Sequence, residues 1–582
     1  MAIENLITEH IDIWTSAVKT RSTSGRGSSK KLELYGVKKL RELILELAVR
    51  GKLVPQDPND EPATVLLERT AQEKAQLLKE KKIKSAKVLP KLGNNEIPFD
   101  IPESWNWIRL GEIGYTQTGG TPKKANSEYF GSDVPFIKPA DITELEVVYD
   151  NEGLSYEGAN ALGRLAPSGS VLMVCIGTIG KCQIIEQDCA FNQQINSVTP
   201  FLPVGSFIFN ALRSSYFRRC AWELSSSTTI AILNKGKWES IPIPLPPIAE
   251  QHRIVAKVDE LMALCDQLEQ QTEASIEAHQ VLVTTLLDTL TNSADADELM
   301  QNWARISEHF DTLFTTEESI DQLKQTILQL AVMGKLVPQD PSDEPAAKLL
   351  KRIAEEKAQL VKEKKIKKQK ALPPIAEDEK PFELPNGWGF AHMQDLCELI
   401  TDGTHQTPKY TDTGRPFISA QCVKPFRFMP ENCRYVSEEH YQAYIKNRNP
   451  EFRDILLSRV GAGIGEAAMI DTDLEFAIYV STGLLKPHKS SVMSEYLVLW
   501  LNSPLGRGFS ERNTLGKGVS QGNLNLSLIR AFTVSLPPLQ EQKRIIEQVN
   551  KLSDLCDLLK ERLQSVQLTQ LSLTDVIAEQ VV

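Results

Sequence analysis

Apolar residues recur at helical spacing in two long stretches of the chain that match each other. In the first stretch the apolar positions follow one another at intervals of four and three residues: Ile254, Val258, Leu261, Cys265 and Leu268. The second stretch repeats this pattern: Ile545, Val549, Leu552, Cys556 and Leu559. This spacing predicts two amphipathic helices of the kind that pack in coiled coils or bundles. A helix from about 250 to 290 would be about 60 Å long at 1.5 Å per residue.

Shorter apolar stripes predict a second pair of helices. One stripe lies at Leu40, Leu43, Ile44 and Leu47, and its copy at Leu323, Ile327 and Leu330. Each is followed by a glycine, Gly51 or Gly334, in the position where a left-handed residue ends a helix. A further helix is expected after each QDP-x-DEPA turn, and it runs into the basic sequence KEKKIK.

Between the helical stretches the pattern changes to that of α+β domains. Residues 98–247 and 381–538 contain short apolar runs such as 171–176 and 455–460, interrupted by Gly, Pro and Asn. Such runs are typical of strands joined by turns. We therefore predict two globular domains of about 150 residues, called the first head and the second head.

The chain also contains an internal duplication. Residues 40–84 and 323–367 are identical at 33 of 45 positions with a constant offset of 283, and LPPIAEQHRI from Leu245 returns as LPPLQEQKRI from Leu536. A duplication of this kind predicts a pseudo-two-fold molecule. The predicted domains are two heads and three helical regions: 1–97 helical, 98–247 first head, 248–380 helical, 381–538 second head and 539–582 helical.

Composition restricts the function without naming it. The 582-residue chain carries a net charge of −11, and neither head is basic, with 11 Lys/Arg against 15 Asp/Glu in the first (net −4) and 15 against 16 in the second (net −1). No apolar run reaches the ~20 residues that span a bilayer, and the nine cysteines include no CxxC pair. The pattern predicts a cytoplasmic protein without a structural metal or disulfide framework.

Several segments resemble the specificity subunits of type I restriction-modification systems. They are ILELAVRGKL (44–53), ILQLAVMGKL (327–336), IPIPLPPIAEQHRIV (241–255), LPPLQEQKRII (536–546), and the head openings TGGTPKKANSEYFGSDVPFIKPADI (118–142) and TDGTHQTPKY…GRPFISAQCVKP (401–425). The resemblance covers residues from about 32 to 580. It implies an α+β protein with two globular α/β target-recognition domains separated by two long antiparallel helical regions.

The resemblance also implies a function. A subunit of this kind reads an asymmetric bipartite site on double-stranded DNA, one half-site per head, and the rigid helices set the spacing. It assembles with two methyltransferase subunits and two restriction subunits. S-adenosylmethionine, ATP and magnesium would belong to those partners, and this chain would carry no cofactor, metal or catalytic residue of its own.

Motifs for independent catalysis are missing from the sequence. An amino-methyltransferase needs an [N/D]PP[Y/F] loop and a motor needs GxxxxGK[ST], and the chain contains neither. The sequence GAGIG at 461–465 resembles a nucleotide-binding loop, but its place after an apolar run favours a turn between two strands, like Gly177 and Gly180 in the first head. Two other hypotheses stay open: a self-contained methyltransferase or nuclease, and a duplicated scaffold that binds only proteins.

Side-chain type and loop position indicate the candidate DNA contacts, because side chains such as Arg, Lys, Asn and Gln read base edges in the major groove. In the first head they are Thr121, Lys123, Lys124, Lys138, Asn192, Gln193, Asn234, Lys235 and Lys237. In the second head they are His405, Gln406, Lys409, Lys424, Lys517, Gln521, Asn523 and Asn525. The basic runs 79–87 and 362–370 are either solvated helix ends or contacts to phosphates. Trp105, Trp388, Cys265 and Cys556 are expected to be packing residues.

Overall fold

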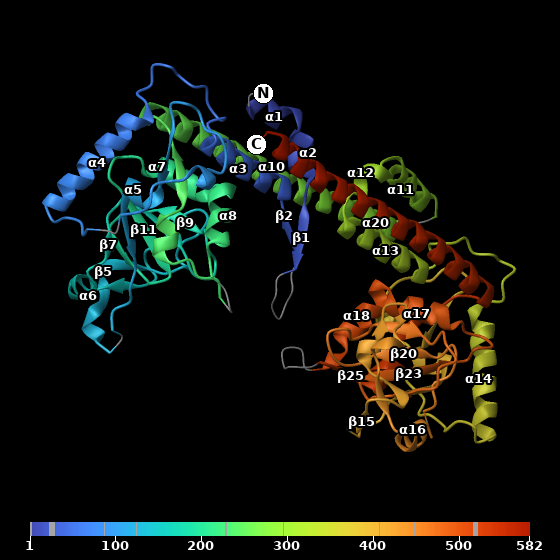
Figure 1. Cartoon of the computed structure of the whole chain (residues 1–582). Coiled ribbons are helices and arrows are strands. Elements are labelled where there is room, and N and C mark those ends of the chain that lie inside the picture. Colours follow the sequence, from blue (N-terminus) through green and yellow to red (C-terminus); the bar gives the residue numbers. More distant parts are fainter. Residues whose placement is uncertain are drawn as a thin grey trace. The chain divides into compact units, whose positions relative to one another are not determined.

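The computed structural model divides into two units, each with one α/β head and several helices (Figure 1). It describes residues 3–22, 30–85, 88–123, 125–226, 230–294, 296–406, 408–446, 448–515 and 522–581. The first unit comprises Met1–Ser275 and Val566–Val582, and the second comprises Ile276–Ser565. The long helices α10 (Ile248–Asn292) and α20 (Leu539–Val581) each contribute residues to both units.

In the first unit the helices outside the head follow the predicted stripes. Helix α3 ends at Val49, and Gly51 has a φ of +68°, as expected of a left-handed helix end. The elements before the first head are α1 (Ile3–Glu9), α2 (Ile11–Ser16), β1 (Lys19–Ser22), β2 (Lys30–Glu33), α3 (Tyr35–Val49) and α4 (Ala63–Lys79). The antiparallel pair β1–β2 is a departure, because we predicted residues 1–97 to be helical.

The first head contains two four-stranded sheets. One is antiparallel in the order β4-β11-β8-β9, and the other has the order β6-β5-β10-β7 with β10 parallel to β5. The elements are β3 (Asn106–Arg109), α5 (Leu110–Ile113), β4 (Gly114–Thr118), β5 (Phe130–Ile137), β6 (Gly153–Leu154), α6 (Tyr156–Leu162), β7 (Leu165–Ala166), β8 (Val171–Val174), β9 (Cys182–Ile184), β10 (Cys189–Phe191), β11 (Ile195–Pro200), α7 (Gly205–Arg213), α8 (Ser215–Glu223), α9 (Lys235–Glu239) and β12 (Pro242–Leu245).

The second unit repeats this plan. Its antiparallel sheet has the order β14-β23-β20-β21, and its mixed sheet β15-β19-β16-β22 again contains one parallel pair, β16 and β22. Its helices before the head are α11 (Ala296–Glu308), α12 (Phe310–Leu313), α13 (Glu317–Val332) and α14 (Ala346–Lys362). Helix α13 also ends before a left-handed glycine, Gly334, whose φ is +73°.

The second head follows a similar order of elements and adds short strands, among them the two-stranded sheets β17-β18 and β24-β25. Its elements are β13 (Gly389–His392), α15 (Met393–Leu396), β14 (Cys397–Asp402), β15 (Tyr410–Thr411), β16 (Arg415–Ile418), β17 (Val423–Lys424), β18 (Arg427–Phe428), β19 (Arg434–Val436), α16 (Glu438–Ile445), β20 (Ile455–Ser458), β21 (Ala467–Met469), β22 (Ala477–Ile478), β23 (Thr482–Pro487), α17 (Ser494–Asn502), α18 (Pro504–Arg512), β24 (Thr514–Leu515), β25 (Asn523–Leu524), α19 (Leu526–Arg530) and β26 (Thr533–Leu536). Short 3-10 turns lie at Asn94–Glu96, Ser127–Tyr129, Glu377–Glu379, Ala420–Cys422 and Pro430–Asn432.

Each head begins and ends on one two-stranded sheet. Strand β3 pairs with β12 in the first head, and β13 pairs with β26 in the second. The pairing brings the two ends of each head together at the helices that flank it. This arrangement is common for domains inserted into a larger chain.

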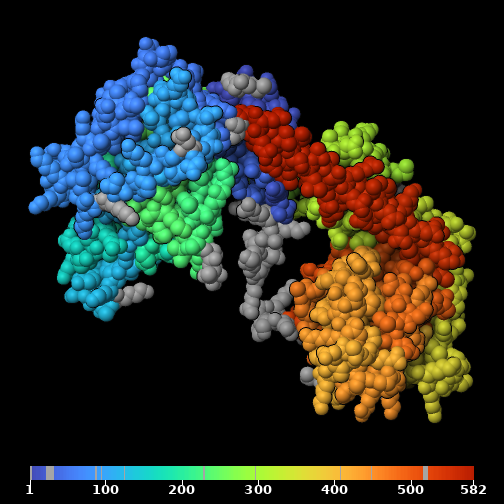
Figure 2. Space-filling model, viewed as in Figure 1, coloured from blue at the N-terminus to red at the C-terminus, as the bar shows by residue number. Residues whose placement is uncertain are grey.

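The predicted stripe of α10 is buried, whereas that of α20 is buried except at Leu552 and Leu559, which are partly buried. Ile254, Val258 and Cys265 on α10 are at most 1% exposed, and on α20 Cys556 is 2% exposed, so these residues serve packing as predicted. In the second unit α13 runs antiparallel to α20, because Lys324 bonds Asp557, whereas Asp321, one turn earlier, bonds Lys560 further along α20. The face of the molecule in Figure 2 shows much of α20 at the surface. None of the described helices is long and apolar enough to cross a membrane.

Candidate nucleic-acid interface

In each head several loops leave the antiparallel sheet at the same end. In the first head β4 ends at Thr118 and β8 ends at Val174, where their partner β11 begins at Ile195. In the second head the corresponding positions are Asp402, Ser458 and Thr482. We call these two loop clusters the strand-end surfaces. Loops carried by a rigid sheet are common places for binding residues.

The first loop of each strand-end surface begins with a glycine. An added β-carbon at Gly119 would lie 2.2 Å from the carbonyl oxygens of Phe191 and Asn192, and one at Gly403 would lie 2.1 Å from the carbonyl oxygen of Ile478. Neither position has room for a side chain. The close approach joins the antiparallel sheet to the mixed sheet, because Phe191 and Ile478 end β10 and β22.

The first head brings three of its candidates together on this surface. Thr121 and Gln193 are exposed, and the Thr121 hydroxyl donates a 2.6 Å hydrogen bond to the Gln193 amide oxygen. Lys123 lies on the same loop and is also exposed. Asn192 is only 7% exposed, and its side chain bonds Gln194 within the turn. Lys124 lies outside the described residues.

The remaining candidates of the first head already have partners within the chain. Asn234 caps α9 by accepting from the Lys237 amide at 2.9 Å, while the Lys237 ammonium donates to the Leu224 carbonyl. Lys235 pairs with Glu239 at 2.7 Å. Lys138 pairs with Glu152. These contacts would compete with DNA for the same donors.

In the second head His405, Gln406 and Lys409 lie exposed on the loop after β14. Lys424 on β17 is 3.6 Å from Glu466, in the turn that joins β20 to β21. The exposed Asn523 on β25 lies near these loops through a bridge to Val460. Asn525 caps α19. Lys517 and Gln521 lie outside the described residues.

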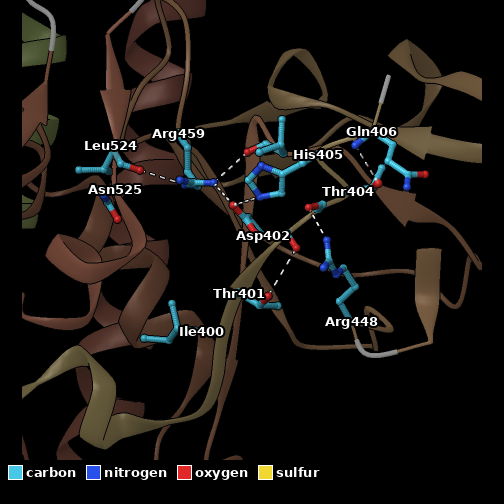
Figure 3. A network of polar contacts seen from close by, with 12 residues as sticks. Ile400, Thr401, Asp402, Thr404, His405, Gln406, Arg448, Arg459, Leu524 and Asn525 are labelled. Atoms are coloured by element: carbon cyan, nitrogen blue, oxygen red, sulfur yellow. Dashed lines mark hydrogen bonds and ion pairs between the residues drawn. The ribbon is translucent and has the colours of Figure 1, made fainter. Parts of the chain in front are cut away.

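A buried ion pair lies beneath the strand-end surface of the second head (Figure 3). The Arg459 guanidinium bonds Asp402 and donates to the carbonyls of Val480 and Leu524, each at 2.9 Å. Sequence reasoning missed this pair. The available signal was that a charged residue, Arg459, directly follows the apolar strand Ile455–Ser458.

The first head has a neutral cluster at the same place. Strand register aligns Thr118, Asn196 and Cys175 with Asp402, Gly483 and Arg459. The Asn196 side chain joins the other two, accepting from Thr118 at 2.8 Å and donating to the Cys175 sulfur at 3.2 Å. In the second head Gly483 has no side chain, and the Arg459 side chain packs over it. The two heads therefore support their loops with different chemistry.

The basic runs after α4 and α14 carry internal ion pairs. Lys82 bonds Glu80 at 2.8 Å, and Lys365 bonds Glu363 at the same distance. Residues 86–87 of the first run lie outside the described part. The contact of these runs with phosphates stays a prediction.

The repeated sequence blocks meet in a buried junction at the start of each long helix. In the first unit the carboxylate of Glu250 accepts from Trp105 at 2.9 Å and from Gln56 at 2.5 Å. Arg253, one turn along α10, pairs with Asp60 at 2.6 Å. The buried Trp105 is therefore a packing residue, as predicted.

The second unit has the same junction. Gln339 donates to the Glu541 carboxylate at 3.2 Å, and Arg544 pairs with Asp343 at 2.7 Å. In both units the QDP-x-DEPA turn contacts the EQ-x-R sequence at the start of the long helix (250–253 and 541–544), which explains why the two sequences are repeated together. Trp388 packs, partly buried, against the core of this unit.

The junction glutamates predict a defined pH dependence of stability. Burial raises the pKa of both Glu250 and Glu541, so the folded state holds their protons more tightly than the unfolded state. Their contribution to stability is present below the usual glutamate pKa and is lost as pH rises through the raised value. We expect the double variant E250Q/E541Q to gain stability relative to the natural chain as pH rises from the usual glutamate pKa through the raised pKa of these two carboxyl groups.

Urea unfolding at a series of pH values measures this difference. The exposed Glu273 on the same helix provides a matched control as E273Q. A difference in unfolding free energy between the double variant and the natural chain that does not change with pH would contradict the assignment.

The motifs examined in the sequence for independent chemistry can be located in the fold. The described residues contain no group of three or more His, Cys, Asp or Glu side chains placed to hold a metal ion. The GAGIG sequence is the turn between the antiparallel strands β20 and β21, as predicted, and Gly461 and Gly465 have φ values of +96° and +83°. Burial raises the pKa of Cys175 to about 12, so this thiol is a poor nucleophile.

Sequence comparisons with known proteins agree on one family. A sequence model described as type I restriction modification DNA specificity domain matches residues 102–278 and 385–568. The type I restriction enzyme EcoEI specificity subunit of Escherichia coli is 41% identical over 606 residues, covering 100% of this chain and 99% of the relative. The EcoAI specificity subunit of the same species is 39% identical, with the same coverage. The HsdS subunit structure from Thermoanaerobacter tengcongensis aligns with 84% of this chain and 98% of its own at 17% identity and a TM-score of 0.40.

Proposed function

Because the chain belongs to the family of type I restriction-modification specificity subunits, we propose that it reads a bipartite site on double-stranded DNA. Each head would bind one half-site through its strand-end surface. The observation that carries the proposal is the presence of two heads with the same fold and different loops. The half-sites would then differ in sequence, and the site would be asymmetric.

Residues at matching positions of the two strand-end surfaces differ, which supports recognition of different base sequences by the two heads. Counted from the aligned ends of β4 and β14, Thr121 of the first head corresponds to His405 of the second. A hydroxyl and an imidazole present different donors and acceptors to a base edge. The candidates that face solvent without a capping role, Lys123 and Lys409 among them, would add contacts to phosphates.

We propose that the helices bind methyltransferase subunits, which in turn recruit the restriction subunits. Apolar side chains exposed on α20 support this role: Leu555, Leu558, Val566 and Leu568 are 44% to 66% exposed. Exposed apolar residues grouped on one element often mark an interface. The net negative charge of the heads also favours recognition by the assembled complex, in which partners hold the duplex.

Methyl transfer, translocation and cleavage would be activities of those partners. This chain would supply sequence selection and the spacing between half-sites, without a catalytic residue, a metal or a cofactor. The chemistry would then depend on S-adenosylmethionine, ATP and magnesium held elsewhere in the complex.

Footprinting of the chain in complex with its methyltransferase partner tests this proposal. We expect two protected segments of different sequence, with an unread spacer between them, and affinity that falls steeply with salt because phosphate contacts release counterions. A single continuous palindromic footprint would contradict the bipartite reading. Binding that does not depend on salt, or methylation by this chain alone, would favour the scaffold or the enzyme hypothesis.

A further inference from the structure

His405 is an exposed side chain held by a buried ion pair. Its side chain is 70% exposed, and Nε2 lies 3.2 Å from Asp402 Oδ2. Asp402 is 10% exposed and Arg459 is 6% exposed. Figure 3 shows the His405 imidazole beside the Arg459 guanidinium, with both facing the Asp402 carboxylate.

The backbone beneath His405 is also held firmly. The Thr404 amide donates to the Ile478 carbonyl at 3.0 Å, and the Thr404 carbonyl accepts from the Val480 amide at 3.1 Å. The Arg448 guanidinium donates to the carbonyl of Gly403. A side chain on a loop held in this way loses little conformational entropy when it binds, which is the benefit of preorganisation.

The contact with Asp402 sets the hydrogen-bonding role of the imidazole. A carboxylate oxygen carries lone pairs and no hydrogen, so the 3.2 Å contact favours the form of the neutral ring that has its hydrogen on Nε2. The other nitrogen, Nδ1, then carries a lone pair and can accept a hydrogen bond from outside. Asp402 acts as a positioning residue here, because it orients the ring and selects its tautomer without reaching the surface itself.

We infer that His405 reads an amino group on a base edge of the second half-site, accepting its hydrogen at Nδ1. In the major groove the amino donors are N6 of adenine and N4 of cytosine. The inference rests on the proposed function and adds to it the class of base atom recognised at one position. It applies to the second head alone, because Thr121 at the matching place of the first head is bonded to Gln193.

Mapping of methylated adenines across a genome gives the first test. The natural chain and the variants H405A and H405F would each be combined with the methyltransferase partner. Both variants should relax the preference at one base pair of the second half-site by about 10-fold, and leave the first half-site unchanged. The control H440Q changes a histidine on α16 that hydrogen-bonds the N-cap residue Ser437. This variant should keep the natural specificity.

Duplexes with single atoms removed give the second test. At the relaxed position adenine would be replaced by purine, or cytosine by 2-pyrimidinone, so that only the amino group is lost. The natural complex should then lose about 10-fold in binding, and the H405A complex should lose nothing further. A 7-deaza purine at the same base pair removes the N7 acceptor and should affect both complexes equally, because His405 is proposed to contact the amino group and not N7.

Three results would overturn the inference: unchanged specificity in H405A and H405F, relaxation in the first half-site, or additive losses from the variant and the missing amino group. Failure of the proposed function is distinguishable, because the natural complex would then methylate no bipartite site at all.

Discussion

Replacing Asp402 by alanine is expected to destabilise the second head by about 3–5 kcal/mol. The substitution leaves the buried Arg459 guanidinium without a counter-charge. The carbonyls of Val480 and Leu524 still accept from it, but they carry no full negative charge. The cost therefore comes mainly from the unpaired charge rather than from the lost hydrogen bond.

Hydrogen exchange followed by mass spectrometry measures the effect locally. Peptides from β14 and β20 should exchange at least about 100-fold faster in D402A, which corresponds to about 3 kcal/mol. Peptides from β4 and β8 should keep their natural rates, because they belong to the other head. Removal of the exposed pair between Arg415 and Glu438 by E438Q provides a control with little expected change.

The first head supplies a rescue for this variant. The triple substitution D402T/R459C/G483N installs the neutral cluster of Thr118, Cys175 and Asn196 in the second head. Exchange protection should return to within about 10-fold of the natural chain, since no charge then stays buried without a counter-charge. A triple variant no better protected than D402A would show that the two clusters are not equivalent.

The helices and the duplication could be predicted because their signals lie close together in sequence. The stripe from Ile254 to Leu268 needs only helical spacing to be recognised, and the structure confirms it as the buried face of α10. Gly51 and Gly334 follow the ends of their helices with a positive φ, which glycine adopts readily, so the residue type alone predicts the helix end. The family resemblance is likewise confirmed by the comparisons.

The site could be predicted only as a set of loops. Whether a polar side chain faces DNA depends on contacts between strands far apart in sequence, and those contacts are invisible in composition. Asn192 and Asn234 carry suitable amides, but the first is buried in a turn and the second caps a helix. Side-chain type and loop position are enough to make His405 a candidate, but its support by Asp402 and Arg459 depends on strand pairing across about 80 residues. Which candidates contact bases stays a prediction.

Replacing Gly403 by alanine is expected to abolish recognition of the second half-site. The new β-carbon would lie 2.1 Å from the carbonyl oxygen and 2.3 Å from the carbonyl carbon of Ile478, both backbone atoms at the end of β22. Backbone cannot rotate away as a flexible side chain does, so the loop and β22 have to move apart. The hydrogen bond from the Thr404 amide to Ile478 would then be lost, and with it the position of His405.

Overpacking of this kind costs about 1–3 kcal/mol and sometimes more, which is enough to displace the loop while the helices stay folded. The methylome of the G403A complex should therefore retain the first half-site and show no selection at the second. The control G389A adds the same methyl group to β13 of the same head, where the nearest atom, Leu350 Cδ1, is 3.4 Å away. G389A should keep the natural bipartite specificity. A G403A complex that still selects both half-sites would show that this loop does not carry the reading of the second head.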